Sequence, residues 1–579
     1  MQPLLLGTAA FVYLIVLFAV ARFGDTHRQT SGFRSRTTMY PLSLAIYCTT
    51  WTFFGSVGLA ATSGITFLAI YVGPILMMTI GFPIVKRIVS LSKRQRSTSV
   101  ADFMGARYGK NAWVAAVATC ISVIGAVPYI ALQLKAVSLS LSQLIGPNSN
   151  DLLTSVPFFG DFSLVIVIGL AIFTILFGTR HADATEHQYG LMLAIALESA
   201  IKLVAFLVVG IFVTYFMFDG FGDLFTQSMA NPSVQGIVDR GVDFGNMIVL
   251  TFLSLIAFLL LPRQFHVAIV ENHSEQELNR ARWLFPLYLI AINIFVLPIA
   301  AAGIVTFGDS ANADGFVLAL PATANNQLVS LLAFIGGLSA GTAMVIVACV
   351  ALAIMISNHL VLPFYLREST YDSRDDGVNM EKRILNIRRT AITVVLLLAY
   401  FYYRAADNTG ALASIGLVSF AAAAQLAPAF FGGLVWRGAN ATGAITGMAI
   451  GFIAWSYTLF LPTLTTETSI FGIALLSRDT FSNMGLTPLA GGVIVSLIAN
   501  ITGWVLGSLA KRPSSLESHQ AMLFVSHRGN TPDADRQTSG LVTVEQVNAN
   551  LARYLGKDRA QRASTRYWKE AGYTADIND

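Results

Sequence analysis

Long apolar runs recur along almost the whole chain and are separated by short polar segments. A helix needs about 20 apolar residues to cross the hydrocarbon of a bilayer. By that measure we predict thirteen membrane spans: 3–21, 39–61, 65–90, 112–145, 162–178, 188–217, 245–268, 283–307, 328–365, 389–404, 410–435, 441–462 and 487–510. The pattern is that of an all-α polytopic membrane protein, with membrane lipid as its main surroundings.

Basic residues are distributed unevenly among the polar segments. The opening "MQPLLLG" carries no Lys or Arg before the first run, which argues against a secretory signal peptide. If the N-terminus lies outside, the inner segments collect most of the basic residues, whereas the outer ones hold Arg240, Arg478 and, at a span edge, Arg404. The positive-inside rule therefore predicts an outer N-terminus and a cytoplasmic C-terminus.

Composition agrees with this class, because 55% of the residues are hydrophobic and 12% are charged. Cys48, Cys120 and Cys349 all fall in apolar stretches without metal-ligand spacing, so we expect no metal site and no cofactor. We find no paired nucleophile and base, so we expect no catalytic site in this chain. The basic residues follow the membrane topology, so we expect no nucleic-acid partner.

The chain becomes polar after "GSLAKRP", which predicts a transmembrane domain at 1–510 and a small cytoplasmic helical domain at 511–579. In "TVEQVNANLARYLGKDRAQ", Thr543 and Gln546 have the spacing of a capping box, and the apolar residues that follow form one helical face. A disordered tail is the alternative.

The second predicted span contains residues that weaken a helix at membrane depth: Thr49, Thr50, Thr52, Gly55, Ser56 and Gly58. Broken helices line binding sites in many transporters, because unwound carbonyls and half-helix ends can coordinate ions and polar solutes. Small residues can equally serve close helix packing. We expect substrate-binding residues here, at Thr50, Trp51, Thr52 and Gly55.

Two further motifs are "STSVADFMGARYG" at 97–109 and "LVSFAAAAQLAPAFFGGLVWRGANATGAITG" at 417–447. With them, residues 1–510 resemble the sodium:solute symporter family. The resemblance implies a LeuT-like core of five plus five helices in inverted repeat, with substrate near the midplane between the broken helices that begin each repeat. It also implies substrate contact for Gln425, which can instead form a hydrogen bond between helices. Gln133 and Ser254, on the fourth and seventh spans, complete the expected substrate site.

The polar tail narrows the resemblance to the input half of CbrA-type sensor histidine kinases, in which a STAC domain follows the transporter-like part. That likeness implies an amino acid such as histidine as the solute, downstream kinase domains and a response regulator as partners, and the bacterial inner membrane as the location. Two functions stay open, a secondary transporter for a small polar solute and a receptor that signals without transport.

Sodium-coupled members of the family carry a pair of hydroxyl residues on the ninth span. Matching "SNHLV" of this chain to the family pattern puts Ala343 and Met344 at that pair, and neither side chain offers an oxygen. Thr342 or Ser339 can substitute if the register differs. This departure weakens the expectation of sodium coupling without removing a conventional sodium-coupled symporter as an alternative.

The stretch "LAIALESAIKLVAFLVV" places Glu198 and Lys202 in the middle of an apolar run. Lys202 lies about 20 Å into its predicted span at ~1.5 Å per residue, and by the resemblance it borders the usual second sodium site. Burial favours the neutral form of an amine, so Lys202 can gain and lose a proton. We therefore predict that Lys202, with Glu198, replaces sodium and couples transport to protons; a permanent ion pair that fixes packing is the alternative.

Overall fold

The computed structural model describes residues 3–26, 33–145, 162–178, 189–308, 312–363, 377–406, 412–464 and 487–526, with residues 469, 470, 473, 474, 481, 561 and 564. The chain divides into two compact units, Met1–Val525 and Ser526–Asp579. The helices predicted after residue 542 lie almost entirely outside the described residues. The domain boundary at residue 510 therefore stays a prediction.

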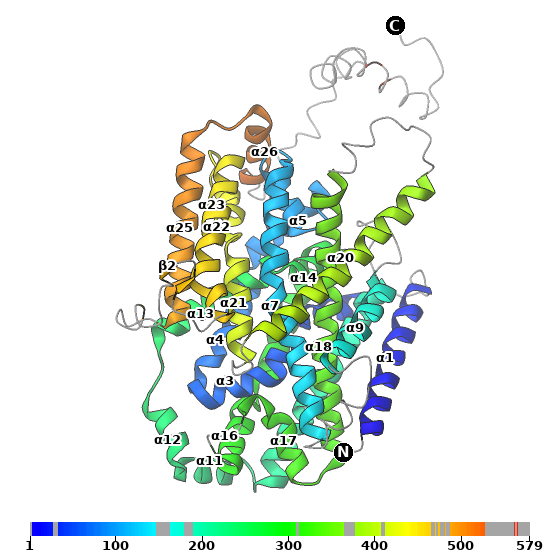
Figure 1. The fold of residues 1–579 in the computed structure, drawn as a ribbon, viewed down its shortest axis with the longest axis vertical. Helices are drawn as coiled ribbons and strands as arrows, with labels where there is room; N and C mark the ends of the chain where they lie inside the picture. Colours follow the sequence, from blue (N-terminus) through cyan, green and yellow to red (C-terminus); the bar gives the residue numbers. More distant parts are fainter. Residues whose placement is uncertain are drawn as a thin grey trace. The chain divides into compact units, whose positions relative to one another are not determined.

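Helices make up nearly all of the described structure (Figure 1). The first group is α1 (Pro3–Thr26), α2 (Phe33–Leu44), η1 (Ala45–Tyr47), η2 (Trp51–Gly55), α3 (Ser56–Ser63), η3 (Gly64–Leu68), α4 (Ala69–Thr79), α5 (Phe82–Gln95), α6 (Val100–Arg107), α7 (Ala112–Ile145), α9 (Phe162–Gly178), α10 (Tyr189–Phe212) and η4 (Val213–Met217). The second group is α11 (Phe221–Ala230), α12 (Pro232–Asp239), α13 (Phe244–Leu260), α14 (Pro262–Phe265), η5 (His266–Val270), α15 (Glu275–Asn293), α16 (Val296–Phe307), η6 (Ala313–Gly315), α17 (Phe316–Thr323), α18 (Gln327–Met355) and η7 (Ile356–Val361). The third group is α20 (Gly377–Ala405), α21 (Leu412–Ala424), α22 (Ala427–Val435), α23 (Ala441–Trp455), η8 (Ser456–Phe460), η9 (Leu461–Thr463), α25 (Pro488–Ala510) and α26 (Ser515–Val525). Strands β1 (Ser469–Ile470) and β2 (Ile473–Ala474) form a small antiparallel pair.

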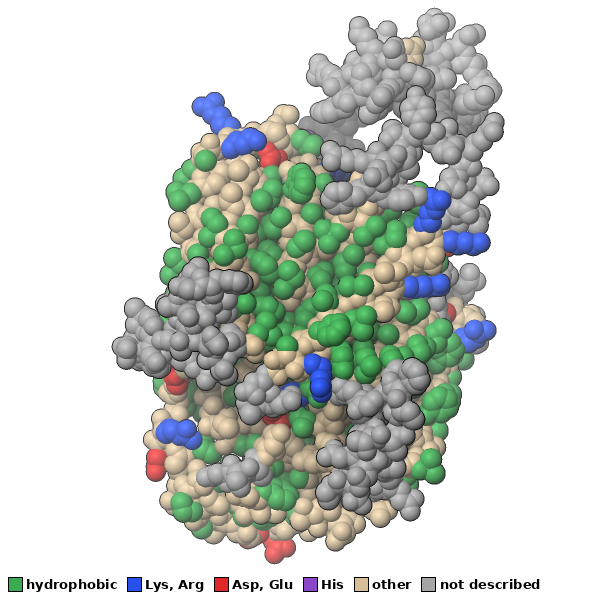
Figure 2. All heavy atoms as spheres, viewed as in Figure 1, with side chains coloured by type: hydrophobic (Ala, Val, Ile, Leu, Met, Phe, Trp, Pro, Cys, Tyr) green, Lys and Arg blue, Asp and Glu red, His purple; other side chains and the backbone are tan. Residues whose placement is uncertain are grey.

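Within the described residues, ten helices are long and apolar enough to cross a membrane, or eleven if the bent pair α12 and α13 counts as one span. Figure 2 shows hydrophobic side chains over the middle of the visible face, with most Lys, Arg, Asp and Glu toward its margins. Both observations identify a multi-pass membrane protein. The count of thirteen stays a prediction. The count from the described residues is lower because residues 51–79 form one continuous helical run and because α9 is too short to be counted.

Two helical spans are interrupted. The first break lies at Cys48 and Thr49, between η1 and η2, where Cys48 has an extended backbone (φ −79°, ψ 97°). The second lies at Leu261, between α13 and α14 (φ −64°, ψ 128°). Pro262 explains the second break, because a proline disfavours the helical conformation of the residue before it. The predicted weakness of the helix near Thr49 is thus a real interruption.

Three long helices surround the first break. α10 packs against α1, α2 and α18, and α7 packs against α18 and α21. α1 lies at one edge of the bundle and the closely packed pair α23 and α25 at the opposite edge (Figure 1). The polar residues of α7, α10 and α18 can therefore meet the unwound backbone between them.

Candidate functional site

The Lys202 side chain ends at the first break. Its ammonium nitrogen donates hydrogen bonds to the backbone carbonyls of Ala45 and Cys48, both at 2.7 Å. The Ala45 carbonyl also accepts the backbone N–H of Cys48, whereas the Cys48 carbonyl lies where the helix is interrupted and needs a partner from outside it. Lys202 is only 1% exposed. A cation supplied by α10 therefore completes the broken end of the neighbouring helix.

Glu198, one turn earlier on α10, has different partners. Its Oε1 accepts hydrogen bonds from the Thr342 hydroxyl at 2.8 Å and the Tyr13 hydroxyl at 3.1 Å. The Ser339 hydroxyl donates to the backbone carbonyl of Glu198 at 2.9 Å. Within the described helix α10, Glu198 and Lys202 form no ion pair. Both hydroxyls of α18 that we considered as sodium ligands thus bind Glu198.

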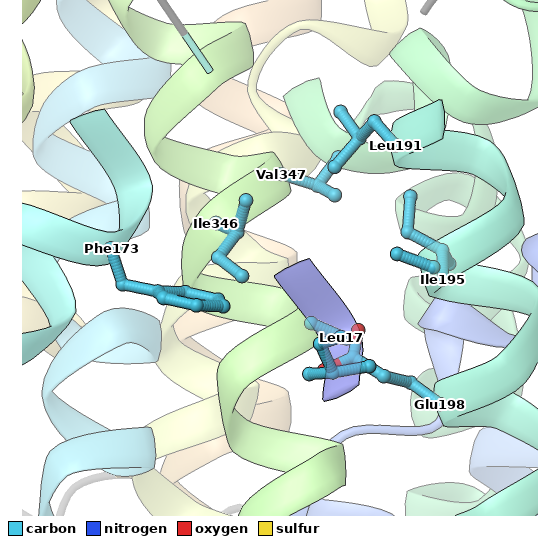
Figure 3. Close-up of a pocket in the computed structure, with 9 residues that line it drawn as sticks. Leu17, Phe173, Leu191, Ile195, Glu198, Ile346 and Val347 are labelled. Atoms are coloured by element: carbon cyan, nitrogen blue, oxygen red, sulfur yellow. The ribbon is translucent and has the colours of Figure 1, made fainter. Parts of the chain in front are cut away.

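A narrow crevice lies beside Glu198 (Figure 3). It is lined by the Phe173 ring and by aliphatic side chains, Ala343 among them, and it leaves no room for a water molecule. Ala343 is one of the two positions that match the hydroxyl pair of the family. The other, Met344, is fully buried. The surroundings of Glu198 are thus apolar apart from its hydrogen-bond donors.

The threonines after the break bind side chains of α7. The backbone N–H and the hydroxyl of Thr50 both donate to Oε1 of Gln133, at 3.2 and 2.7 Å. The Thr49 hydroxyl shares a hydrogen bond of 2.9 Å with the Tyr129 hydroxyl. Gln133 is held in turn by the carbonyl of Tyr129. The structure therefore brings Thr50 and Gln133 together, as the predicted substrate site requires.

Aromatic side chains pack around Trp51. Its indole meets Phe420 edge to face at 5.1 Å, and Phe420 stacks on Tyr129 at 5.7 Å. The guanidinium of Arg263 lies over the Tyr129 ring, 4.2 Å from its centre. Thr52 is buried, and a Cβ on Gly55 would lie 2.5 Å from the Trp51 ring. Only glycine at residue 55 leaves space for this indole.

Sequence reasoning missed Arg263, Tyr129 and Phe420. Arg263 follows the second break and is only 3% exposed. Its signal was present in "LPRQFHVAIVE", where an arginine directly follows a proline within an apolar segment. The two aromatic residues carry no such signal, because the chain has 39 Phe and 18 Tyr.

Gln425 and Ser254 contact other helices. Gln425 donates to the Ser496 hydroxyl at 3.0 Å and accepts from Asn500 of α25 at 3.1 Å. Ser254 donates to the carbonyl of Ala69, at the start of α4, at 3.0 Å. These bonds connect neighbouring helices, so substrate contact by Gln425 and Ser254 stays a prediction.

Across the described parts of the chain, no group of three His, Cys, Asp or Glu side chains could hold a metal ion. The break centre, which we define as both breaks together with Tyr129, Gln133, Lys202 and Phe420, therefore offers carbonyls, hydroxyls, rings and cations. Carbonyls and hydroxyls at broken helices can coordinate ions and polar solutes.

Comparisons with protein families and with curated proteins find no match. Among solved structures, the chain is similar to a substrate-bound, outward-open Na+-coupled sialic acid symporter, with a TM-score of 0.61 and 14% identity over 88% of this chain and 99% of that one. A manganese transporter of Eremococcus coleocola aligns with a TM-score of 0.40 and 14% identity, over 84% of this chain and 90% of that one. A mutant of the same manganese transporter aligns with a TM-score of 0.43 and 13% identity, over 82% and 94%.

The fold and the span composition together define the class. The chain is a multi-pass membrane protein with the fold of secondary transporters.

Proposed function

We propose that the chain is a secondary transporter that imports a small polar solute together with a proton. The observation that carries this proposal is the position of the Lys202 ammonium between the carbonyls of Ala45 and Cys48. Carbonyls at a broken helix are the ligands that a coupling cation needs. Here the chain supplies the cation itself, so a proton on Lys202 takes the role of a dissolved ion.

Protonation of Lys202 then controls the contact between α10 and the first break. The charged ammonium donates strong hydrogen bonds to both carbonyls, which hold α10 against η1. A neutral amine donates weaker ones. Loss of the proton therefore loosens this contact and lets the two helices separate, as alternating access requires.

The finer architecture is also part of the proposal. We propose thirteen spans with the N-terminus outside, and a five-plus-five inverted repeat formed by the second to sixth and the seventh to eleventh spans. The two observed breaks support it, because they fall in the second and the seventh predicted spans, at the start of each repeat. The domains are 1–510 and 511–579. The solute we favour is an amino acid such as histidine, and the location is the bacterial inner membrane.

The test is uptake of a radiolabelled L-amino acid mixture by the purified full chain in liposomes. An inward proton gradient should drive uptake by the wild type, and a sodium gradient alone should not. Lys202→Met should abolish the proton dependence. Lys86→Met is the matched control, because Lys86 is half exposed and pairs with Glu275. If uptake by Lys202→Met keeps its proton dependence, Lys202 is not the coupling group.

A signalling role is the second candidate, and α26 favours it. Arg87 of α5 donates to the carbonyls of Leu434, at the end of α22, and Phe524, at the end of α26. The Phe524 ring packs against Phe103 at 5.3 Å. A movement of α22 on solute binding would thus reach α26, the first helix after residue 510. If the chain is a sensory input to a kinase, the rate of amide hydrogen exchange in α26 should change on addition of L-histidine. A receptor without transport would show this change but would not accumulate solute.

A further inference from the structure

We propose that Arg263 binds the carboxylate of the transported solute, so that the substrate is a small carboxylic acid. This inference rests on the proposed function, since it names the substrate class of the same break centre. Arg263 lies at the second break, whereas Lys202 completes the first break.

The guanidinium of Arg263 has an unused edge. Its Nε and Nη2 atoms are both buried, and neither has a hydrogen-bond partner among the described residues. These two N–H groups form the side-on edge of the fork, which matches the two oxygens of a carboxylate. A charged group that is buried without partners is costly. An arginine at a helix break, whose Nε and Nη2 atoms have no hydrogen-bond partner among the described residues, is therefore suited to bind an anion.

The charges around Arg263 also favour the binding of an anion. Lys202 lies close enough to Arg263 for the two cations to interact. Glu198, one turn before Lys202 on α10, already accepts bonds from Tyr13 and Thr342. The next carboxylate along the broken helix, Glu271, lies 3.5 Å from His266. Within the described residues neither Lys202 nor Arg263 forms an ion pair with a carboxylate, so an anion beside them would offset their positive charge.

The rings beside Arg263 limit the size and type of the solute. Tyr129 lies under the guanidinium, Phe420 stacks on Tyr129, and Trp51 meets Phe420 edge to face. The buried indole Nε1 of Trp51 also lacks a partner among the described residues, so it offers a further N–H to an acceptor. A carboxylate on a small apolar or aromatic body satisfies these groups together. A neutral sugar would leave the guanidinium uncompensated.

This assignment links binding to the proton. Arg263 and protonated Lys202 both attract the solute carboxylate. Protonation of Lys202 therefore favours solute binding, and solute binding favours protonation of Lys202 to the same extent. Deprotonation of Lys202 on the inner side would weaken the carboxylate site and promote release.

The test measures the melting temperature of the purified full chain with each common L-amino acid, with the carboxamide of each, and with neutral sugars. At least one acid should stabilise the wild type while its amide does not. Arg263→Met should bind that acid about 30-fold more weakly or worse, and Arg263→Lys should recover part of the loss through its charge. Arg240→Met, at an exposed arginine of the outer segment, should bind as the wild type does.

The proposal is overturned if an amide or a sugar stabilises the wild type as well as the best acid, if no acid stabilises it, or if Arg263→Met binds the acid normally. The comparison of acid with amide needs no variant, so it decides even if Arg263→Met fails to fold. Uptake separates the two proposals. An acid that binds through Arg263 but is never accumulated contradicts transport and leaves this site standing, whereas accumulation that is unchanged in Arg263→Met contradicts the site alone.

Discussion

The two breaks differ in how their polar groups are satisfied. At the first, Lys202 donates to the carbonyls of Ala45 and Cys48, and Thr50 donates to the side-chain oxygen of Gln133. At the second, the fork of Arg263 and the side-chain oxygen of Gln264 have no partner within the described residues. The first break is thus completed by the chain, and the second presents a cation that lacks an anion.

This difference teaches where a ligand should act. A bilayer cannot solvate the backbone, so each interrupted helix must find partners inside the protein or in a cavity. The first break has found them and should be stable without solute. The second should change most when solute binds, because there the Nε and Nη2 atoms of the Arg263 guanidinium gain their first hydrogen-bond partners.

The largest expected effect comes from removing the cation of the first break. Lys202→Ala removes two hydrogen bonds of a charged donor, at about 1.5–3 kcal/mol for each, leaves the Ala45 carbonyl with the N–H of Cys48, and opens space for a dissolved ion. We expect the unfolding free energy to fall by about 2–5 kcal/mol and sodium chloride, unlike choline chloride, to restore part of it. The wild type and the control Lys86→Ala should show no sodium-specific stabilisation. Equal melting temperatures of Lys202→Ala in the two salts would argue against an ion-like role for the ammonium.

A smaller effect is expected at the contact between the first break and α7. In Gln133→Leu, the N–H and the hydroxyl of Thr50 lose their common acceptor. We expect a loss of about 2 kcal/mol in unfolding free energy. Gln143→Leu is the control on the same helix, because Gln143 is exposed and should change stability by less than about 0.5 kcal/mol. A loss at residue 133 no larger than at residue 143 would mean that this contact is not needed to hold the break.

Much of this arrangement was predictable, for physical reasons. Hydropathy locates helices because lipid demands long apolar runs. The cluster of small and hydroxyl residues around Thr50 indicated a broken helix, and that prediction is confirmed. Glu198 and Lys202 stood out because charge at membrane depth is costly. Each of these signals is local, so a single stretch of sequence contains it.

The partners of these residues were not predictable, because they depend on packing between distant segments. Tyr13 reaches Glu198 from a helix 185 residues away in sequence, and nothing in "AAFVYLIV" distinguishes it from a lipid-facing tyrosine. Arg263 stands near the end of its predicted span, where an arginine is ordinary. Only the break at Leu261 brings its guanidinium over Tyr129.

Tyr13 offers a test of whether the first span contributes to the coupling group. Tyr13→Phe removes one of two hydroxyls that donate to Glu198 while keeping the ring. We expect a loss of about 1 kcal/mol in stability, smaller than in Gln133→Leu because Thr342 remains. The optimum of proton-driven uptake should also shift in pH, since Glu198 loses a donor. An unchanged optimum would place Tyr13 outside the coupling machinery.

The smallest effect concerns the contacts of Glu517, outside the membrane. Their pH dependence must be distinguished from that of the two breaks when pH profiles are compared. Burial alone would raise the pKa of Glu517, but hydrogen bonds from the N–H groups of Ser514 and Ala441 hold it below its ordinary value. Because the folded pKa is the lower one, this carboxylate stabilises the fold above its ordinary pKa of 4.5, and that stability is lost as pH falls through the folded value.

Glu517→Gln should therefore flatten the decline in melting temperature below about pH 4.5 and leave the proton dependence of uptake near neutral pH unchanged. Glu381→Gln, at an exposed carboxylate of α20, controls for the loss of charge. If Glu517→Gln instead alters uptake near neutral pH, the contact of Glu517 with Ser514 and Ala441 takes part in coupling. The proton dependence could then no longer be assigned to the first break alone, and the contrast between a self-completed break and a ligand-completed one would lose its main support.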